Sequence, residues 1–141
     1  MERRKFLESI GIGAAFVLST ACLHSCGKNE PNTTPTPTTG VDFTLNLDDA
    51  ANASLKQNGG FVIANGVVVA KDKDGKFVAA TQLCSHAGFK TVKFDNSKNE
   101  FMCTTHGARF DTLGKGLNSE GSNGLTIYKT TQTGSSLRVF A

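Results

Sequence analysis

Short segments of strand-forming residues follow one another from residue 41 onward, and the first of them alternates apolar and polar side chains. The segment VDFTLNL, residues 41–47, switches side-chain type at each step, as a half-buried strand does. Turn-forming pairs such as Asn65-Gly66 and Asp74-Gly75 separate the short segments that follow. Those further β-rich segments are residues 60–66, 67–72, 76–82, 90–95, 99–103, 125–131 and 136–140. The pattern predicts an all-β fold, either an antiparallel β-sandwich or a small barrel.

Only residues 48–57 have a composition that suits a short helix. The apolar positions of the predicted strands indicate which side chains form the core. We expect the core to contain Phe61, Val62, Val67, Val69, Phe77, Leu125, Ile127, Leu137 and Val139.

The first 26 residues have the features of an export signal or membrane anchor. A charged start, Arg3-Arg4-Lys5, precedes an apolar run over residues 10–23. This run is shorter than the roughly 20 residues that a membrane-spanning helix needs, but it suits the apolar part of a secretory signal. Arg3-Arg4 followed by Phe6-Leu7 resembles the twin-arginine export signal, and an ordinary Sec signal is the alternative.

Two cysteines, Cys22 and Cys26, close this segment, and small residues precede each of them. Both resemble the processing site of bacterial lipoproteins. We favour Cys26 as the lipidated residue, because cleavage before it leaves no free thiol in an oxidising compartment. The sequence therefore predicts a location on the periplasmic, or extracytoplasmic, side of a bacterial membrane, with a lipid or a retained N-terminal anchor.

Residues 27–40, GKNEPNTTPTPTTG, contain no apolar side chain to bury and are rich in Thr and Pro. We expect an extended, solvated linker of about 40 Å, at about 3.1 Å per residue. The domain then occupies residues 41–141. The net charge is only +3, and no basic block is longer than Arg3-Arg4-Lys5. Composition therefore gives no support for nucleic-acid binding.

Most of the metal-binding side chains of the chain lie in two short motifs. Cys84 and His86 form a C-x-H motif, and Cys103 and His106 form a C-x-x-H motif sixteen residues further on. Residues 90–95 and 100–103 are predicted strands with a turn between them. An antiparallel hairpin returns its end beside its start, so we expect the two motifs to meet.

Two thiolates and two imidazoles suit either a tetrahedral zinc ion or a 2Fe–2S cluster with two Cys on one iron and two His on the other. Zinc fingers usually pair Cys with Cys and His with His around a helix, whereas both motifs here are mixed and the segment between them is strand-like. A disulfide between Cys84 and Cys103 is a further alternative, but it leaves His86 and His106 unexplained.

The spacing C-x-H, sixteen residues, C-x-x-H-G resembles the motif of Rieske proteins, and the flanking segments DGKFVAATQLCSHAG and HGARFDTLGKG agree. The resemblance covers about residues 42–140. It implies a Rieske-type fold with a cluster-binding subdomain made by two loops. It also implies one 2Fe–2S cluster, with Cys84 and Cys103 on the inner iron and His86 and His106 on the outer, solvent-facing iron.

The resemblance further implies one-electron transfer with a redox partner protein, such as a quinol-oxidising complex, a molybdenum enzyme or a cytochrome. A structural zinc module or a disulfide-bonded binding domain is the alternative function. Rieske oxygenases need a second iron site with two more His, and only His24 remains in this sequence. We therefore expect an electron-transfer protein that is not an enzyme by itself.

High-potential relatives carry an extra Cys in each loop, and the matching positions here are Phe89 and Thr105. They also carry Ser and Tyr where this chain has Ala108 and Phe110, and those hydroxyls donate hydrogen bonds to cluster sulfurs. The resemblance thus implies a potential low in the family range of about −150 to +300 mV. Residues 119–124, SEGSNG, replace a proline-rich loop that covers the cluster in many relatives.

Overall fold

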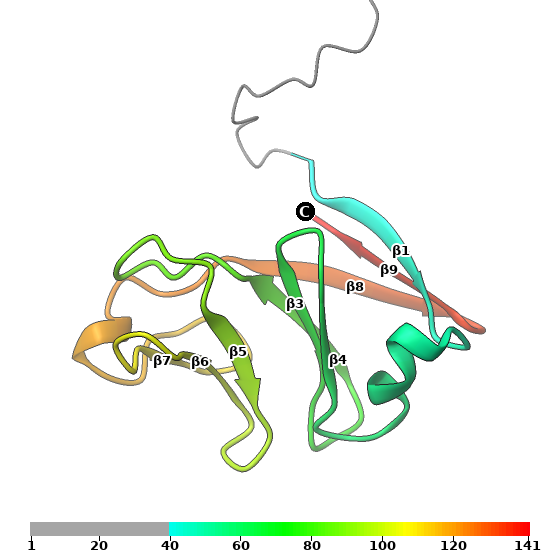
Figure 1. The fold of residues 1–141 in the computed structure, drawn as a ribbon, viewed down its shortest axis with the longest axis horizontal. Helices are drawn as coiled ribbons and strands as arrows, with labels where there is room; N and C mark the ends of the chain where they lie inside the picture. Colours follow the sequence, from blue (N-terminus) through cyan, green and yellow to red (C-terminus); the bar gives the residue numbers. More distant parts are fainter. Residues whose placement is uncertain (1–39) are drawn as a thin grey trace, which may run out of the picture. The chain divides into compact units, whose positions relative to one another are not determined.

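The computed structural model describes residues 40–141, and this part of the chain is built from short antiparallel strands (Figure 1). Two short 3-10 helices, η3 (Ala50–Lys56) and η4 (Ser119–Gly121), interrupt them. The strands are β1 (Asp42–Asn46), β2 (Phe61–Ala64), β3 (Val67–Lys71), β4 (Phe77–Thr81), β5 (Val92–Asp95), β6 (Glu100–Cys103), β7 (Arg109–Phe110), β8 (Ile127–Thr133) and β9 (Ser136–Phe140).

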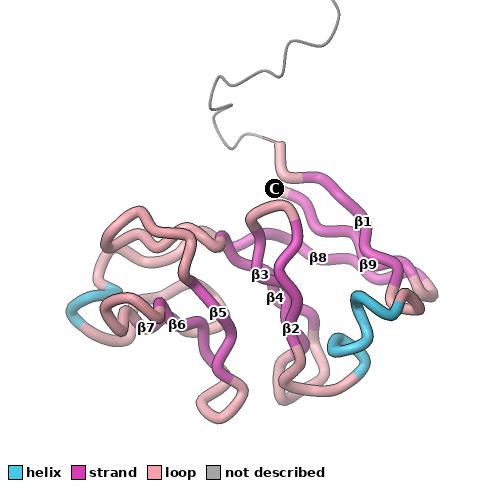
Figure 2. Tube along the Cα trace, viewed as in Figure 1, coloured by secondary structure: helices cyan, strands magenta, loops and turns pink. Residues whose placement is uncertain are grey.

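Six strands form one sheet in the order β1-β9-β8-β4-β3-β2. Strand β8 joins its two halves, because it pairs with β4 at its start and with β9 over the rest of its length. Figures 1 and 2 show β8 running past both halves, and the sheet curls around a core. The predicted all-β, antiparallel fold is confirmed.

Strands β5, β6 and β7 form a second, smaller sheet, which the chain inserts between β4 and β8. The backbone N–H of Thr81 donates to the carbonyl of Thr126 at 3.0 Å, so the outgoing and returning chains are joined at the base of the insertion. The hairpin turn of β5 and β6 is tied back as well, since Asn99 Oδ1 accepts a hydrogen bond from the N–H of Lys73 at 2.9 Å. The insertion is thus held at both ends.

The core consists of two clusters of buried apolar side chains. One lies within the larger sheet and includes Leu55 of η3, and the other joins β3 and β4 to the smaller sheet through Phe94, Phe101 and Phe110. Of the predicted core, Val67, Val69, Leu125, Leu137 and Val139 are buried. Phe61, Val62, Phe77 and Ile127 are partly buried and pack against these clusters.

The predicted helix over residues 48–57 is present, although it is a 3-10 helix from Ala50 to Lys56. The sequence pattern did not indicate β7, which has two residues, or η4, which has three. Within residues 40–141, no helix is long and apolar enough to cross a membrane. The predictions for the signal segment, residues 1–26, and for nearly all of the linker lie outside the described residues.

Candidate metal centre

The two motifs form a pair of loops with the same backbone hydrogen bonds. We call residues 84–89 the first loop and residues 103–108 the second loop. In the first loop, the N–H of Cys84 donates to the carbonyl of Phe89 at 2.8 Å, and the N–H of Gly88 donates to the carbonyl of Cys84 at 2.8 Å. Each loop thus begins with a Cys whose N–H and carbonyl both close the turn.

The second loop repeats this arrangement. The N–H of Cys103 donates to the carbonyl of Ala108 at 2.8 Å, and the N–H of Gly107 donates to the carbonyl of Cys103 at 3.0 Å. Gly88 and Gly107, each four residues after a Cys, have φ values of +70° and +74°. Only glycine adopts this conformation without strain, which explains why both loops carry it there.

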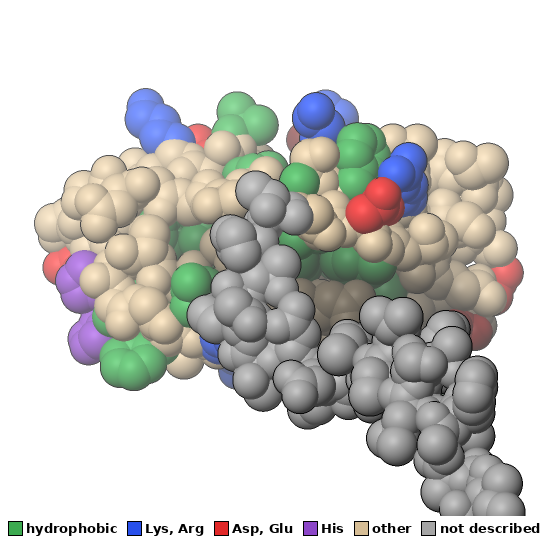
Figure 3. Space-filling model, turned by 90° about the horizontal axis from the view of Figure 1, so that it is seen from above, with side chains coloured by type: hydrophobic (Ala, Val, Ile, Leu, Met, Phe, Trp, Pro, Cys, Tyr) green, Lys and Arg blue, Asp and Glu red, His purple; other side chains and the backbone are tan. Residues whose placement is uncertain are grey.

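The β5–β6 hairpin brings the two loops together, as the sequence predicted. Val92 at the start of β5 lies opposite Cys103 at the end of β6. The ring centroids of His86 and His106 are 5.1 Å apart, with an angle of 73° between the ring planes. Both imidazoles are exposed, and Figure 3 shows the purple histidine side chains next to each other at the surface.

The two cysteines lie on the opposite, buried side of the loops. Cys84 and Cys103 are 1% and 0% exposed, and both are free thiols. Burial raises the pKa of the Cys84 thiol. Burial also raises the pKa of Cys103, but hydrogen bonds from Thr91, from Cys84 and from the N–H groups of residues 105 and 106 outweigh it and lower the pKa to about 7. The second loop therefore favours a thiolate, the form that binds metal.

The four candidate ligands divide into a buried sulfur pair and an exposed imidazole pair. Across residues 40–141, no group of three or more His, Cys, Asp or Glu side chains is gathered as the ligands of one metal ion would be. This donor set fits a group with two metal atoms, one held by sulfur and one by nitrogen, better than it fits a single tetrahedral ion.

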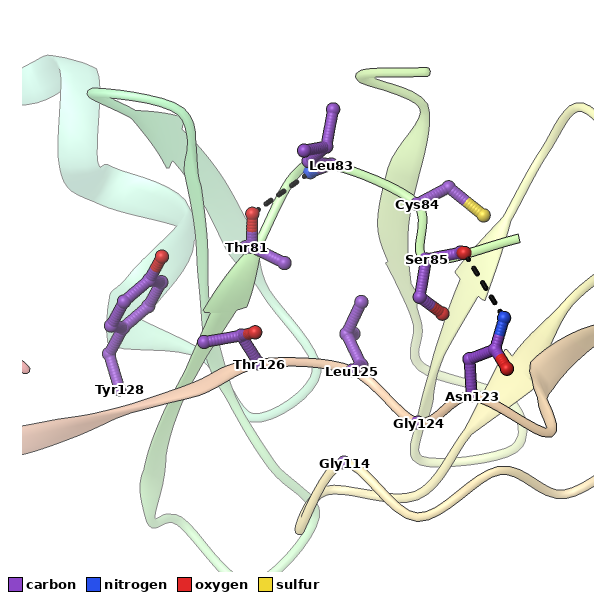
Figure 4. A pocket seen from close by; sticks show the side chains of 10 residues that line it. All are labelled: Thr81, Leu83, Cys84, Ser85, Gly114, Asn123, Gly124, Leu125, Thr126 and Tyr128. Carbon is purple, nitrogen blue, oxygen red and sulfur yellow. Dashed lines mark hydrogen bonds between the residues drawn. The ribbon is translucent and has the colours of Figure 1, made fainter. Parts of the chain in front are cut away.

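Two asparagines brace the loops from the segment around η4. Asn118 Nδ2 donates to the carbonyl of Gly107 at 2.8 Å, while its Oδ1 accepts from the N–H groups of Arg109 and Gly121 at 3.0 Å each. Asn123 Nδ2 donates to the carbonyl of Ser85 in the first loop at 3.4 Å (Figure 4). The chain from Asn118 to Asn123 around η4 therefore contacts both loops.

A charged pair holds β7, which follows the second loop, against β6. Arg109 Nε donates to Glu100 Oε1 at 2.6 Å, and its second nitrogen donates to Oε2 at 2.8 Å. The hydrogen bonds and charge of Glu100, which is 3% exposed, raise the pKa of Arg109. This bidentate contact fixes the end of the second loop.

The remaining residues near the site differ in their environment. Ala108, the last residue of the second loop, and Phe110 of β7 are both fully buried. Phe89 is 54% exposed, and its ring centroid lies 6.4 Å from that of His106. Phe89 therefore adds apolar surface beside the imidazoles.

An open cleft of about 440 Å³ lies between the start of the first loop and the segment that leads into β8. Figure 4 shows Thr81, Thr126 and Tyr128 along its larger-sheet end and Ser85 and Asn123 at the loop end. Thr81 Oγ1 accepts a hydrogen bond from the N–H of Leu83 at 3.1 Å and so shapes the chain as it enters the first loop.

Comparison with protein families matches residues 46–129 to the Rieske [2Fe-2S] domain. No similar protein was found among those with curated functions. Among solved structures, the plasma membrane Rieske protein PetC3 of the cyanobacterium Synechocystis PCC 6803 is 29% identical, with a TM-score of 0.52. The match covers 63% of this chain and 93% of that protein.

Two further structures have the same kind of similarity. The ferredoxin of carbazole 1,9a-dioxygenase from Nocardioides aromaticivorans IC177 is 26% identical over 59% of this chain and 86% of its own, with a TM-score of 0.48. The quaternary ammonium Rieske monooxygenase CntA is 14% identical over 72% of this chain and 31% of its own, with a TM-score of 0.52, which shows the fold alone.

The chain therefore belongs to the Rieske [2Fe-2S] domain family. The cofactor of this domain is a single 2Fe–2S cluster, as the sequence resemblance implied, and electron transfer is the role that these similarities support. Sequence reasoning placed the two loops but did not find Asn118, Asn123 or the Glu100–Arg109 pair. Their partners are mostly backbone groups or residues distant in sequence, so no local motif indicates them.

Replacement of Asn118 by Ala is expected to destabilise the protein and speed the loss of iron. It removes three hydrogen bonds, at about 0.5–1.5 kcal/mol each, so the free energy of unfolding should fall by about 2 kcal/mol. Urea denaturation and the rate of iron release to a chelator measure the two effects. Asn123→Ala, which removes one long hydrogen bond, is the control and should change stability by less than about 0.5 kcal/mol. Equal effects of the two variants would contradict the bracing role of Asn118.

Proposed function

We propose that Cys84, Cys103, His86 and His106 are the ligands of the 2Fe–2S cluster and that the protein carries single electrons. The observation that supports this most directly is the pair of matched loops, which gathers two thiols inside and two imidazoles at the surface. When bound, the cluster supplies one-electron redox chemistry. The burial of both cysteines keeps water away from the sulfur ligands, while the exposed imidazoles offer a short route to a partner.

The same loops define where a partner would dock. His86 and His106 lie at the surface beside the exposed ring of Phe89, so the contact face combines polar rings with apolar area. Each imidazole has two nitrogens, and a nitrogen that is not a ligand can hold or release a proton. A redox partner that binds this face would come close to the imidazoles and could exchange a proton there as well as an electron.

The zinc and oxygenase alternatives have less support. Zinc fingers usually pair Cys with Cys and His with His, whereas each loop here carries one Cys and one His. Similarity to the monooxygenase covers only about a third of that enzyme, so its activity does not transfer. We infer an electron carrier or electron-transfer subunit that is not an enzyme by itself. A quinol-oxidising complex, a molybdenum enzyme and a cytochrome all fit as its partner.

We further propose that the carrier works on the periplasmic side of a bacterial membrane, attached through lipid on Cys26. The charged and apolar N-terminal pattern supports this, as does similarity to PetC3, which is a plasma membrane Rieske protein. Residues 27–40 would then serve as the tether.

The cluster assignment is tested on the purified protein. Chemical analysis should find equal amounts of iron and acid-labile sulfide, and the paramagnetic resonance spectrum of the reduced protein should have the low average g value of mixed His and Cys ligation. His86→Ala and His106→Ala should each lose this spectrum, because each removes a ligand. Lys90→Ala, an exposed change next to the first loop, is the control and should keep it. Bound zinc without sulfide would disprove the assignment.

The buried residues Ala108 and Phe110 provide a test of the low potential. Ala108→Ser and Phe110→Tyr should each raise the midpoint potential, because a hydroxyl that donates to sulfur stabilises the more negative, reduced state. The expected rise is on the order of a tenfold change in the reduction equilibrium, about 59 mV for one electron. Protein-film voltammetry measures it. Ala79→Ser, at a buried position in the other core cluster, is the control, and the absence of a rise in both variants would refute this account.

The membrane attachment depends on Cys26. Cys26→Ser should abolish lipid addition and move the protein from the membrane fraction to the soluble fraction of its host, because a thiol is needed to carry the lipid. Intact-protein mass spectrometry and fractionation measure this. Cys22→Ser is the matched control and should leave both unchanged. If Cys22→Ser alone releases the protein, the lipid is on Cys22, and if neither variant does, attachment is not by lipid at these residues.

A further inference from the structure

Three side chains form a hydrogen-bonded series that ends on a cysteine of the site. Thr105 Oγ1 lies 2.8 Å from Thr91 Oγ1, and Thr91 Oγ1 lies 3.2 Å from Cys103 Sγ. Thr105 belongs to the second loop, whereas Thr91 immediately precedes β5. The series therefore leaves the second loop at Thr105 and returns to it at Cys103, which is the sulfur that it contacts among residues 40–141.

The backbone holds Thr91 in this position. Its N–H donates to the carbonyl of Phe89 at 2.9 Å, and its carbonyl accepts from the N–H of Thr104 at 3.1 Å. The hydroxyl of Thr104 also donates to that carbonyl, at 3.2 Å. Because Thr91 is partly buried and fixed at both backbone groups, its hydroxyl is oriented before any metal binds.

The number of available protons fixes the direction of the series. A metal-bound thiolate has no proton to donate, so in the loaded site Thr91 must be the donor to Cys103. The single hydroxyl proton of Thr91 is then used, and the contact with Thr105 requires Thr105 to donate to Thr91. Each hydroxyl thus donates toward the sulfur, and donation from Thr105 polarises the Thr91 hydroxyl further.

We propose that Thr91, supported by Thr105, sets the reduction potential by donating a hydrogen bond to the sulfur of Cys103. This inference rests on the proposed ligand set. Reduction adds negative charge at the sulfur, and a hydrogen bond to a more negative acceptor is stronger. The contact therefore stabilises the reduced state more than the oxidised state and raises the potential. Ala108 and Phe110 carry no hydroxyl and therefore cannot donate a hydrogen bond to a sulfur. The hydroxyl of Thr91 supplies part of this missing stabilisation of the reduced state.

Thr91→Val tests the proposal, because it keeps the branched shape and removes only the hydroxyl. The iron and sulfide content should stay unchanged, and the reduction equilibrium constant should fall about tenfold, a decrease of about 59 mV in the midpoint potential for one electron. Thr91→Ser should restore the wild-type value. Thr105→Val should shift the potential in the same direction by a smaller amount, because it removes the second donor.

Thr104→Val is the matched control in the same loop, since its hydroxyl contacts a backbone carbonyl and no sulfur. It should leave the potential unchanged. Electron–nuclear double resonance of the reduced protein gives an independent readout. The N–H groups of residues 105 and 106 also donate to Cys103, so transfer to D₂O should replace their protons in every variant. One further strongly coupled proton should exchange in the wild type and in Thr104→Val, and this further coupling should be missing in Thr91→Val.

Equal shifts in Thr91→Val and Thr104→Val, or as many exchangeable couplings in Thr91→Val as in the wild type, would overturn the proposal. If Thr91→Val does not retain the cluster, the midpoint potential of Thr105→Val is the test. An unchanged potential in Thr105→Val would then overturn the proposal. The proposed function fails separately, because then the wild-type protein itself would lack iron, sulfide and the mixed-ligand spectrum.

Discussion

The pairing of β5 with β6 is the constraint on which the site depends. Because Val92 lies opposite Cys103, the hairpin returns the second loop to the first, although the two cysteines are far apart in sequence. The relative position of the two loops comes from the hairpin and from Phe94 and Phe101, whose rings pack against each other in the core. The binding of any metal group between the loops therefore depends on the buried side chains that hold the hairpin in place.

The features that sequence could predict are those that local rules determine. Alternation gave the strands, and the turn at residues 96–99 followed from its composition, so the meeting of the two motifs could be anticipated. Strand β7 could not be predicted because two residues carry no periodicity. It pairs with β6, and Arg109 in it also binds Glu100 of β6. Asn118 caps the start of η4 by a local hydrogen bond from the N–H of Gly121. Its contacts with Gly107 and Arg109 could not be predicted, because only the folded chain brings these backbone groups within reach.

The electrostatics of the site were also only partly visible in the sequence. In high-potential relatives, hydroxyls at the positions of Ala108 and Phe110 donate hydrogen bonds to sulfur. Because Ala108 and Phe110 lack hydroxyls, the sequence comparison predicts no side-chain donor to the sulfur ligands. The structure adds Thr91, which lies twelve residues before Cys103 and reaches its sulfur only because β5 and β6 pair. A residue outside both motifs thus becomes part of the sulfur environment, and a motif-based comparison of potentials has to include it.

The division between buried sulfur and exposed nitrogen gives the two halves of the site different tasks. Water is excluded from Cys84 and Cys103, so hydrogen bonds to these sulfurs act in a medium of low polarity and have a large effect on the charge held there. The imidazoles of His86 and His106 face solvent, where electrostatic interactions with an approaching partner are screened. Substitutions around the sulfurs should therefore change the driving force for electron transfer, whereas substitutions around the imidazoles should change which partner is recognised and how fast it binds.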